Sequence, residues 1–304
     1  KNCFPKISID WKIKFRLLSE PEYEPLKSLG DLGLMLSLPG CELYSDPSLG
    51  WMERWYCRLL GVPIVGLRIR LRWLRRRLPP TASRVLDGGC GRGVIARQLA
   101  WHYPQAVIDA IDQDRQGQKI NQEIAKACHI GNCRFLVGDL TTLDSNGEYD
   151  LIVSVDNLEH IENDLDVLRH FYRAMQPGGT LVVHVPHYYR RWLLFKWSRN
   201  FDVPGHVRPG YHLPELTERV RKSGFTIERA GFSYGFLENL ANNLSYAISA
   251  AEQKNQALYA LLFPILNLVA WLGQWGNPSM GAGVWCVARR SLAEPNPART
   301  DNRA

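Results

Sequence analysis

The residues with the clearest chemical potential are a carboxylate and three alternating glycines at the end of a predicted buried strand. Residues 85–93 read VLDGGCGRG, and the members of interest are Asp87, Gly89, Gly91 and Gly93. Glycines lack a Cβ atom and let the backbone approach a ligand closely, while the N–H groups at the start of the following helix face that ligand. The segment therefore predicts a cofactor-binding turn between a strand and a helix.

Two kinds of cofactor fit such a turn. The run from Gly91 to Ala96 has the form G-x-G-x-x-A of a dinucleotide fingerprint, with Asp112 about twenty residues further on. However, Asp87 lies at the mouth of the loop, where a carboxylate repels a pyrophosphate and attracts a cation such as the methionine end of S-adenosylmethionine (SAM). We favour the cationic ligand and keep a nicotinamide dinucleotide as the alternative.

Further acids follow the later predicted strands. Asp112, Asp139 and Asp156 each come at or directly after the end of an apolar run. Ligands of open α/β sheets bind at this edge, and a carboxylate can accept two parallel O–H bonds from a diol. The alternative for each acid taken alone is a helix cap or a loop anchor.

With these motifs in view, the chain resembles class I SAM-dependent methyltransferases over about residues 84–232. The resemblance implies SAM as the cofactor, with Asp112 on the ribose hydroxyls, Asp139 on the adenine amino group and Leu140 beside the adenine ring. The cofactor-binding residues that it implies are Asp87, Gly89, Cys90, Gly91, Gly93, Asp112, Gln113, Asp139, Leu140 and Asp156.

The segment 149–161 is similar to the fourth strand of small-molecule and lipid methyltransferases, which often carry a Glu-His pair at this point; here the pair is Glu159-His160. The sequence lacks the Asn/Asp-Pro-Pro-aromatic loop of base-amino methyltransferases and the Pro-Cys pair of cytosine-C5 enzymes. A nucleic-acid partner is therefore not favoured, and we expect a small-molecule or lipid acceptor. The alternatives are an RNA-directed methyltransferase and a SAM-fold protein that binds its ligand without catalysis.

Methyl transfer from a sulfonium is an in-line displacement, so a general base is optional. If one acts, His160 and His187 are the catalytic candidates because both are expected near the ligand-binding edge, whereas His184, inside a strand, is expected to pack. The connection before the penultimate helix offers acceptor-site candidates, with a rigid turn as the alternative. These candidates are His206, Arg208, Tyr211 and His212.

These residues require a layered fold to bring them together. Short apolar runs alternate with helical stretches between residues 83 and 186, which predicts a parallel sheet with crossover helices. The resemblance implies a three-layer α/β, Rossmann-like sheet of seven strands with the last strand antiparallel. The expected divisions are an N-terminal helical extension (1–80), a SAM-binding core (81–234), an apolar helical insertion (235–282), the last core strand (283–290) and a disordered tail (291–304).

Composition limits the class of protein. The 304 residues are 45% hydrophobic and 22% charged, enough to bury a large core. Seven cysteines are scattered without a CxxC pair or a Cys/His set at zinc-ligand spacing, so we expect reduced thiols, no metal site and a cytoplasmic protein without a secretory signal.

The net charge of +7 is concentrated in one predicted helix, residues 63–78, with leucines on one stripe and six arginines on the rest. The apolar run 257–273 falls short of the roughly 20 residues of a spanning helix. One hypothesis is that this helix and the insertion form an apolar cap over the acceptor site and rest on an anionic membrane surface. Two alternatives are that both merely pack on the sheet, or that the arginines contact RNA phosphates.

Overall fold

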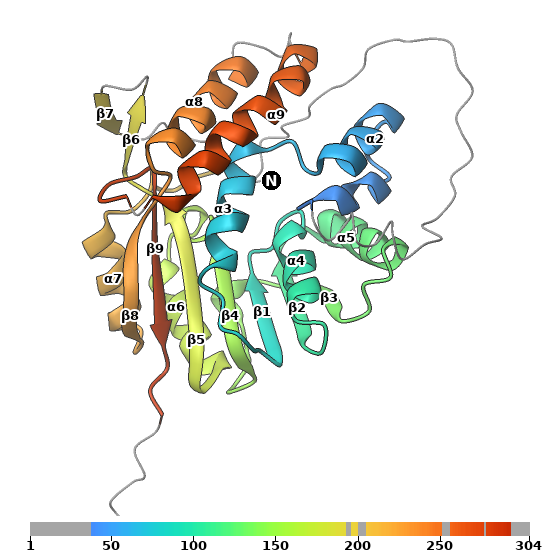
Figure 1. The fold of residues 1–304 in the computed structure, drawn as a ribbon. Coiled ribbons are helices and arrows are strands. Elements are labelled where there is room, and N and C mark those ends of the chain that lie inside the picture. Colours follow the sequence, from blue (N-terminus) through green and yellow to red (C-terminus); the bar gives the residue numbers. More distant parts are fainter. Residues whose placement is uncertain (1–37, 193–195, 200–204, 251–255, 277, 293–304) are drawn as a thin grey trace, which may run out of the picture.

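The computed structural model describes residues 38–192, 196–199, 205–250, 256–276 and 278–292 (Figure 1). A seven-stranded sheet with the order β3-β2-β1-β4-β5-β9-β8 forms its centre. Its strands are β1 (Arg84–Gly88), β2 (Val107–Asp112), β3 (Cys133–Val137), β4 (Tyr149–Val155), β5 (Met175–Pro186), β8 (Thr226–Ser233) and β9 (Gly283–Arg289). Strand β9 runs antiparallel to both β5 and β8, so the predicted sheet with a reversed last strand is confirmed.

This order also decides between the two cofactor classes at the level of the fold. A dinucleotide-binding sheet of the usual kind has six parallel strands in the order 3-2-1-4-5-6. Here an antiparallel strand is inserted between the fifth and sixth strands of that series. The nicotinamide alternative therefore loses its structural basis.

Helices cover both faces of the sheet, which gives the expected three layers (Figure 1). They are α2 (Trp51–Leu60), α3 (Val65–Arg75), α4 (Val94–His102), α5 (Arg115–Ala127), α6 (Asp164–Ala174), α7 (Leu213–Lys222), α8 (Phe236–Ala250) and α9 (Gln256–Leu272). Short 3-10 helices are η1 (Cys41–Ser45), η2 (Leu140–Thr142), η3 (Leu158–His160) and η4 (Gly273–Trp275), and a separate hairpin consists of β6 (Tyr189–Trp192) and β7 (Lys196–Arg199).

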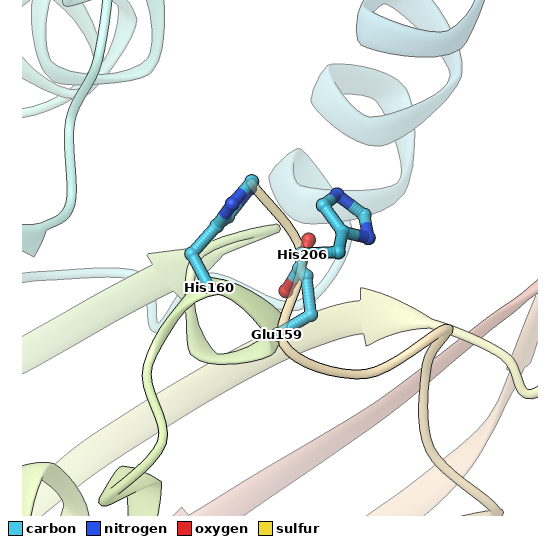
Figure 2. Close-up of side chains that lie close together, drawn as sticks. All are labelled: Glu159, His160 and His206. Carbon is cyan, nitrogen blue, oxygen red and sulfur yellow. The ribbon is translucent and has the colours of Figure 1, made fainter. Parts of the chain in front are cut away.

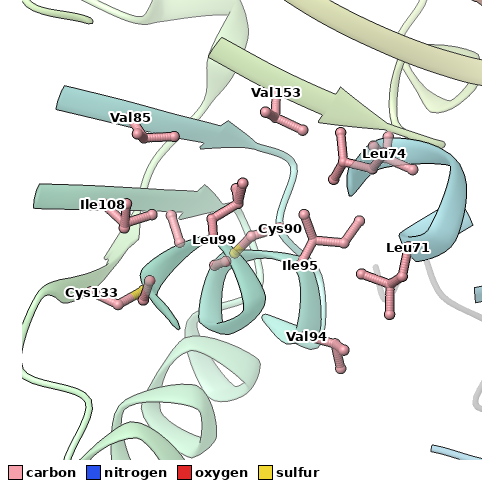
Figure 3. Packing of buried hydrophobic residues seen from close by; sticks show 14 of the residues in the cluster. Leu71, Leu74, Val85, Cys90, Val94, Ile95, Leu99, Ile108, Cys133 and Val153 are labelled. Carbon is pink, nitrogen blue, oxygen red and sulfur yellow. The ribbon is translucent and has the colours of Figure 1, made fainter. Parts of the chain in front are cut away.

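Alternate residues of each central strand face opposite cores. Val85 of β1 packs among residues of α3, α4 and α5, while the adjacent Leu86 packs among residues of α6 and α7. Figure 3 shows the first of these cores, where Leu71 and Leu74 of α3 lie close to Ile95 of α4. Helix α3 is thus a core helix and not a surface appendage.

The expectation of a basic outer face on this helix is wrong. Of the six arginines, Arg75 and Arg76 are exposed, whereas the other four are buried or half-buried. Arg72 donates to the side-chain oxygen of Asn267 in α9 at 3.1 Å, and the Arg77 guanidinium lies 3.9 Å from the ring centroid of Trp285 in β9. Because α3 lies between the sheet on one side and α8 and α9 on the other, most of its cations face protein.

The insertion is helical, as predicted, and packs on α3. Phe263 and Leu266 of α9 are buried against Val65 and Ile69 of α3. The opposite side of α9 is also apolar and is exposed. Its exposed residues are Leu258, Leu261, Ile265, Leu268 and Leu272, spaced three and four apart on one helix face.

Two expectations concern parts of the chain beyond these ranges. The first part of the predicted N-terminal helical extension falls on residues 1–37, and the disordered tail predicted from residue 291 falls largely on 293–304. Both lie outside the described residues.

Candidate functional site

Strand register places the predicted cofactor acids at one edge of the sheet. Asp87 of β1 is level with Ala110 of β2, and Asp112 at the end of β2 is level with Val137 of β3. Asp139 lies two residues beyond the end of β3. The carboxyl ends of neighbouring parallel strands therefore bring the three carboxylates to the same edge, where open α/β sheets bind their ligands.

The glycine loop between β1 and α4 depends on residues without a Cβ atom. Gly89, Gly91 and Gly93 all have positive φ, at 84°, 50° and 67°. A Cβ atom on Gly89 would lie 2.2 Å from the side chain of Asn157, and one on Gly93 would lie 2.6 Å from the Phe135 ring. A Cβ atom on Gly91 would meet no described atom within 4 Å, so the side of the loop at Gly91 is open.

Asp87 is a buried carboxylate in need of a positive partner. It is 1% exposed, and its Oδ2 atom has no hydrogen-bond partner among the described residues. Burial and the neighbouring Asp112 raise the pKa of Asp87 to about 7, while a hydrogen bond from the Ala96 backbone opposes the shift. A cationic ligand group beside Asp87 would offset both unfavourable terms.

Asp112 connects the end of β2 to the glycine loop. One of its carboxylate oxygens accepts from the Gly91 N–H at 2.8 Å, and the other accepts from the Asp114 N–H at 3.0 Å. The side chain is half-buried, and a carboxylate has further lone pairs that could accept from a ligand. This placement fits the predicted role on a ribose diol.

At the end of β3, Asp139 is exposed and caps η2 by accepting from the Thr141 N–H at 2.8 Å. Burial opposes ionisation of Asp139, but hydrogen bonds from Thr141 and from Gln113 lower its pKa overall. The structure therefore brings Gln113 and Asp139 together across the ends of β2 and β3. Asp139 serves as a helix cap as well, which was the alternative expected from the sequence.

Two predicted cofactor residues turn their side chains into the core instead. Leu140 is buried among residues of the α6 and α7 core, which leaves its side chain no open face for an adenine ring. The Cys90 thiol lies 3.4 Å from Gln118 Oε1 inside the α4 and α5 layer. The burial of Leu140 disagrees with its predicted place beside an adenine ring. Cys90 is predicted to bind the cofactor without a stated side-chain role, and its backbone could still do so.

Asp156 is engaged by the protein itself. Its Oδ1 atom accepts from His184 Nδ1 at 2.8 Å, and its Oδ2 atom pairs with Arg70 of α3. His184 Nε2 in turn lies 2.7 Å from Ser233 Oγ. Burial opposes ionisation of Asp156, but Arg70 and His184 lower its pKa overall. The side chain predicted to hold the cofactor therefore joins α3 to the sheet, and His184 packs in the strand as expected.

The acceptor-site candidates divide into two groups. Tyr211 is fully buried and its hydroxyl donates to Asp164 Oδ2 at 2.6 Å, while Arg208 pairs with the same carboxylate. These two residues form a rigid buried turn and are corrected as acceptor contacts. His206, by contrast, lies 4.4 Å from His160 between ring centroids.

The other two candidate histidines, His187 and His212, lie between the end of β5 and the start of α7. His187 is 3% exposed and its Nδ1 atom bonds to the Gly281 carbonyl at 2.9 Å, and burial lowers its pKa. His212 stacks on Tyr188 with ring centroids 4.6 Å apart. His187 therefore has little access to an acceptor in this conformation.

Residues that secure the glycine loop from the N-terminal side have no recognisable pattern in the sequence. Arg97 of α4 and Glu42 of η1 form a fully buried ion pair at 3.2 Å, and Arg97 also donates to the Arg92 carbonyl in the loop at 2.7 Å. The Arg92 side chain pairs with Asp46 at 2.9 Å. Ion pairs between distant segments have no local pattern, so reasoning from spacing could not identify them.

One large groove lies away from these residues. It has a volume of about 520 Å³ and lies between α5 and the edge strand β3, with Gln122, Lys126 and Phe135 in its lining. None of the predicted site residues lines this groove. It is not at the ends of the central strands, and we do not assign the cofactor to it.

Comparison with known proteins agrees with this geometry. The profile of a family described as "Methyltransferase domain" matches residues 67–230, more than half of the chain. A trans-aconitate 2-methyltransferase of Streptomyces avermitilis is 31% identical over 136 residues, which cover 42% of this chain and 44% of that protein. A ubiquinone biosynthesis O-methyltransferase of Thiobacillus denitrificans is 27% identical over 112 residues, covering 36% and 47%. The chain thus spans less than half the length of these curated relatives.

A solved structure shares the fold at low sequence identity. Phosphoethanolamine N-methyltransferase 2 of Haemonchus contortus, in complex with SAM, superposes with a TM-score of 0.50 and 16% identity, covering 86% of this chain and 57% of that one. The sheet order and the acids at its edge define the Rossmann-like class of methyltransferase folds. The chain belongs to the methyltransferase-domain family, and the resemblance to class I SAM-dependent methyltransferases is confirmed.

The tight contact at Gly89 leads to a prediction with an internal control. Gly89→Ala places a methyl group against Asn157 at a positive φ, and we expect a loss of about 2 kcal/mol or more in the free energy of unfolding. Gly91→Ala keeps only the backbone strain and should cost about 1 kcal/mol. Urea denaturation of both variants measures this difference; equal losses would show that the Asn157 contact does not restrict the loop.

Proposed function

We propose that this chain is a SAM-dependent methyltransferase. The observation that carries the proposal is the unpartnered, buried carboxylate of Asp87 at the base of an open glycine loop, beside Asp112. Asp87 would attract the cationic methionine end, Asp112 would accept from the ribose hydroxyls, and the Gln113 and Asp139 pair would lie beside the adenine. When bound, SAM supplies an activated methyl group on a sulfonium.

The acceptor that we propose is an apolar or lipid-like small molecule carrying an oxygen nucleophile. A relative named as a ubiquinone biosynthesis O-methyltransferase supports an acceptor oxygen, and relatives named as trans-aconitate 2-methyltransferases support a small-molecule acceptor. Helices α3, α8 and α9 lie over the part of the edge formed by β4 and β5, and they pack on one another through apolar side chains. An apolar acceptor would be shielded from water there, which favours transfer to the acceptor over side reactions.

We propose further that α9 rests on a membrane surface. Its outer stripe is strongly exposed, with Leu261 at 73% and Ile265 at 59%, while the opposite stripe packs on α3. The stretch Ala257–Trp275 is long and apolar enough to cross a membrane by length and composition, with a mean hydropathy of 1.6, which is weak evidence by itself. Because the inner side of α9 contacts protein, a position in the interface suits it better than a span.

The structure changes the expected character of that contact. The notion of an anionic surface rested on the six arginines of α3, of which only Arg75 and Arg76 are exposed. Insertion of apolar side chains, and not attraction to acidic lipids, would then supply most of the binding energy. The inward arginines also weaken the alternative of an RNA partner, since few of them can reach phosphates. Cytoplasmic localisation stays a prediction.

Transfer of labelled methyl groups tests the activity. The purified chain should transfer label from methyl-labelled SAM to an oxygen atom of a component in an organic extract of cells, giving a product one CH₂ unit heavier by mass spectrometry. Asp112→Ala removes the expected partner of the ribose diol and should lower kcat/KM by about ten- to a hundredfold. Glu148→Ala, at an exposed acid directly before the amino end of β4 and so at the opposite edge of the sheet, should leave it unchanged. Equal rates for both variants would contradict the proposed site.

Flotation with liposomes tests the membrane contact. The chain should float with neutral phosphatidylcholine vesicles, and added salt should change the bound fraction little. The double variant Leu261→Glu with Ile265→Glu should weaken binding at least about tenfold, since it places charge on the exposed stripe. Leu136→Glu, at an exposed leucine on the distant edge strand β3, is the matched control. Binding that disappears with salt, or that survives the double variant, would refute contact through α9.

A further inference from the structure

Three potential metal ligands converge beside the glycine loop. Glu159 and His160 belong to η3, and His206 lies on the loop before α7. One donor atom from each residue can be chosen so that all three lie within 4.8 Å of one another. Figure 2 shows the Glu159 carboxylate between the two imidazole rings.

Two of these donors lack a protein partner although they are shielded from water. Glu159 is 1% exposed, and its Oε2 atom has no hydrogen-bond partner among the described residues. The buried Nδ1 atom of His206 is likewise without a partner there. A buried polar atom without a partner destabilises a fold, so two of them within one cluster call for a ligand.

A divalent cation suits this set of donors. An ionised carboxylate and the unprotonated nitrogen of an imidazole both bind metals. A bound cation would therefore give a partner to the Oε2 atom of Glu159 and to an imidazole nitrogen of His206.

Backbone contacts hold the three side chains in place. The Val207 N–H donates to the Glu159 carbonyl at 2.9 Å, and His160 Nδ1 bonds to the Gly205 carbonyl at 3.0 Å. These bonds join the loop that carries His206 to η3 on both sides of the cluster. Because His160 uses Nδ1 in this way, its Nε2 atom is the donor that would face a metal, as is common when a carbonyl orients a metal-binding histidine.

We propose that Glu159, His160 and His206 bind a divalent transition-metal ion such as Zn²⁺. Two imidazoles and one carboxylate form the ligand set of many three-ligand zinc sites, which leave a position open for water or substrate. The donor atoms already lie within 4.8 Å of one another, so small side-chain rotations would suffice to bring them to one ion. These three side chains alone would form the protein part of the site.

The position of the cluster gives the ion a use, which rests on the proposed methyltransferase function. Asn157, two residues before Glu159, packs against the glycine loop at Gly89, so the cluster lies close to the proposed cofactor edge. The ion would bind the hydroxyl or carboxylate oxygen of the acceptor. A hydroxyl bound in this way loses its proton to water more readily, which makes a separate general base unnecessary. His160 then acts as a ligand and not as the base expected from the sequence.

Metal titration of the full chain tests the site without any need for activity. The metal-free protein, titrated with CoCl₂, should bind one ion and develop the visible absorption bands of Co²⁺ with nitrogen and oxygen ligands, and ZnCl₂ should displace it. Glu159→Gln, which keeps the size of the side chain, and His206→Ala should each weaken binding by about ten- to a hundredfold. His129→Asn, at an exposed histidine in the turn after α5, should bind as the native chain does.

Several results would overturn the proposal: no Co²⁺ bands up to millimolar metal, or equal affinity in the native chain and Glu159→Gln, or a loss of affinity in His129→Asn that matches the loss in His206→Ala. Circular dichroism and thermal unfolding of each variant confirm that it is folded, and Glu159→Gln provides the decisive comparison if His206→Ala is not. Binding of S-adenosylhomocysteine to the same samples separates the two proposals. If the chain binds no Co²⁺ but still binds S-adenosylhomocysteine, only the metal site is refuted.

Discussion

The site depends on one unfavourable electrostatic arrangement. Asp87 is buried beside Asp112, and the Oδ2 atom of Asp87 has no hydrogen-bond partner among the described residues. Two carboxylates at adjacent strand ends destabilise each other unless a cation or a set of O–H donors lies between them. A ligand that brings a positive group to Asp87 and a diol to Asp112 removes both costs at once. The same arrangement disfavours a pyrophosphate, which would add negative charge at this point.

The rest of the structure holds this edge in one geometry. On one side, the buried pair of Arg97 and Glu42 fixes the N-terminal segment against the glycine loop. On the other side, Arg70 and His184 fix Asp156, and thereby connect α3 to the ends of β4 and β5. Helix α3 in turn packs on α8 and α9, so these two helices are linked through α3 to the strand ends that would hold the cofactor and the acceptor. Several charged side chains that could bind ligands, judged from the sequence, thus form ion pairs within the protein.

The sequence was sufficient for the sheet, the glycine loop and the three acids, because these features follow from local periodicity, turn chemistry and strand ends. It was not sufficient for the direction of individual side chains. The leucine stripe of α3 predicts one contact face and therefore outward arginines. In the structure α3 has two contact faces, one toward the sheet and one toward α8 and α9. The sequence predicts Arg208, Tyr211 and Asp156 as ligand contacts, yet their partners are residues far away in the chain. The spacing of residues along the sequence does not reveal such partners. The same reason explains why Glu159, His160 and His206 were not recognised as a set.

Calorimetric titration with S-adenosylhomocysteine across the pH range tests the central claim most directly. Only the ionised form of Asp87 attracts the ammonium group of the nucleoside, and its pKa in the free protein is raised to about 7. The account predicts that affinity rises from about pH 5.5 to about pH 8, by nearly tenfold per unit below pH 7, and that Asp87→Asn binds weakly with no such dependence. Affinity that is independent of pH in the native chain, or equal in the native chain and Asp87→Asn, would contradict it.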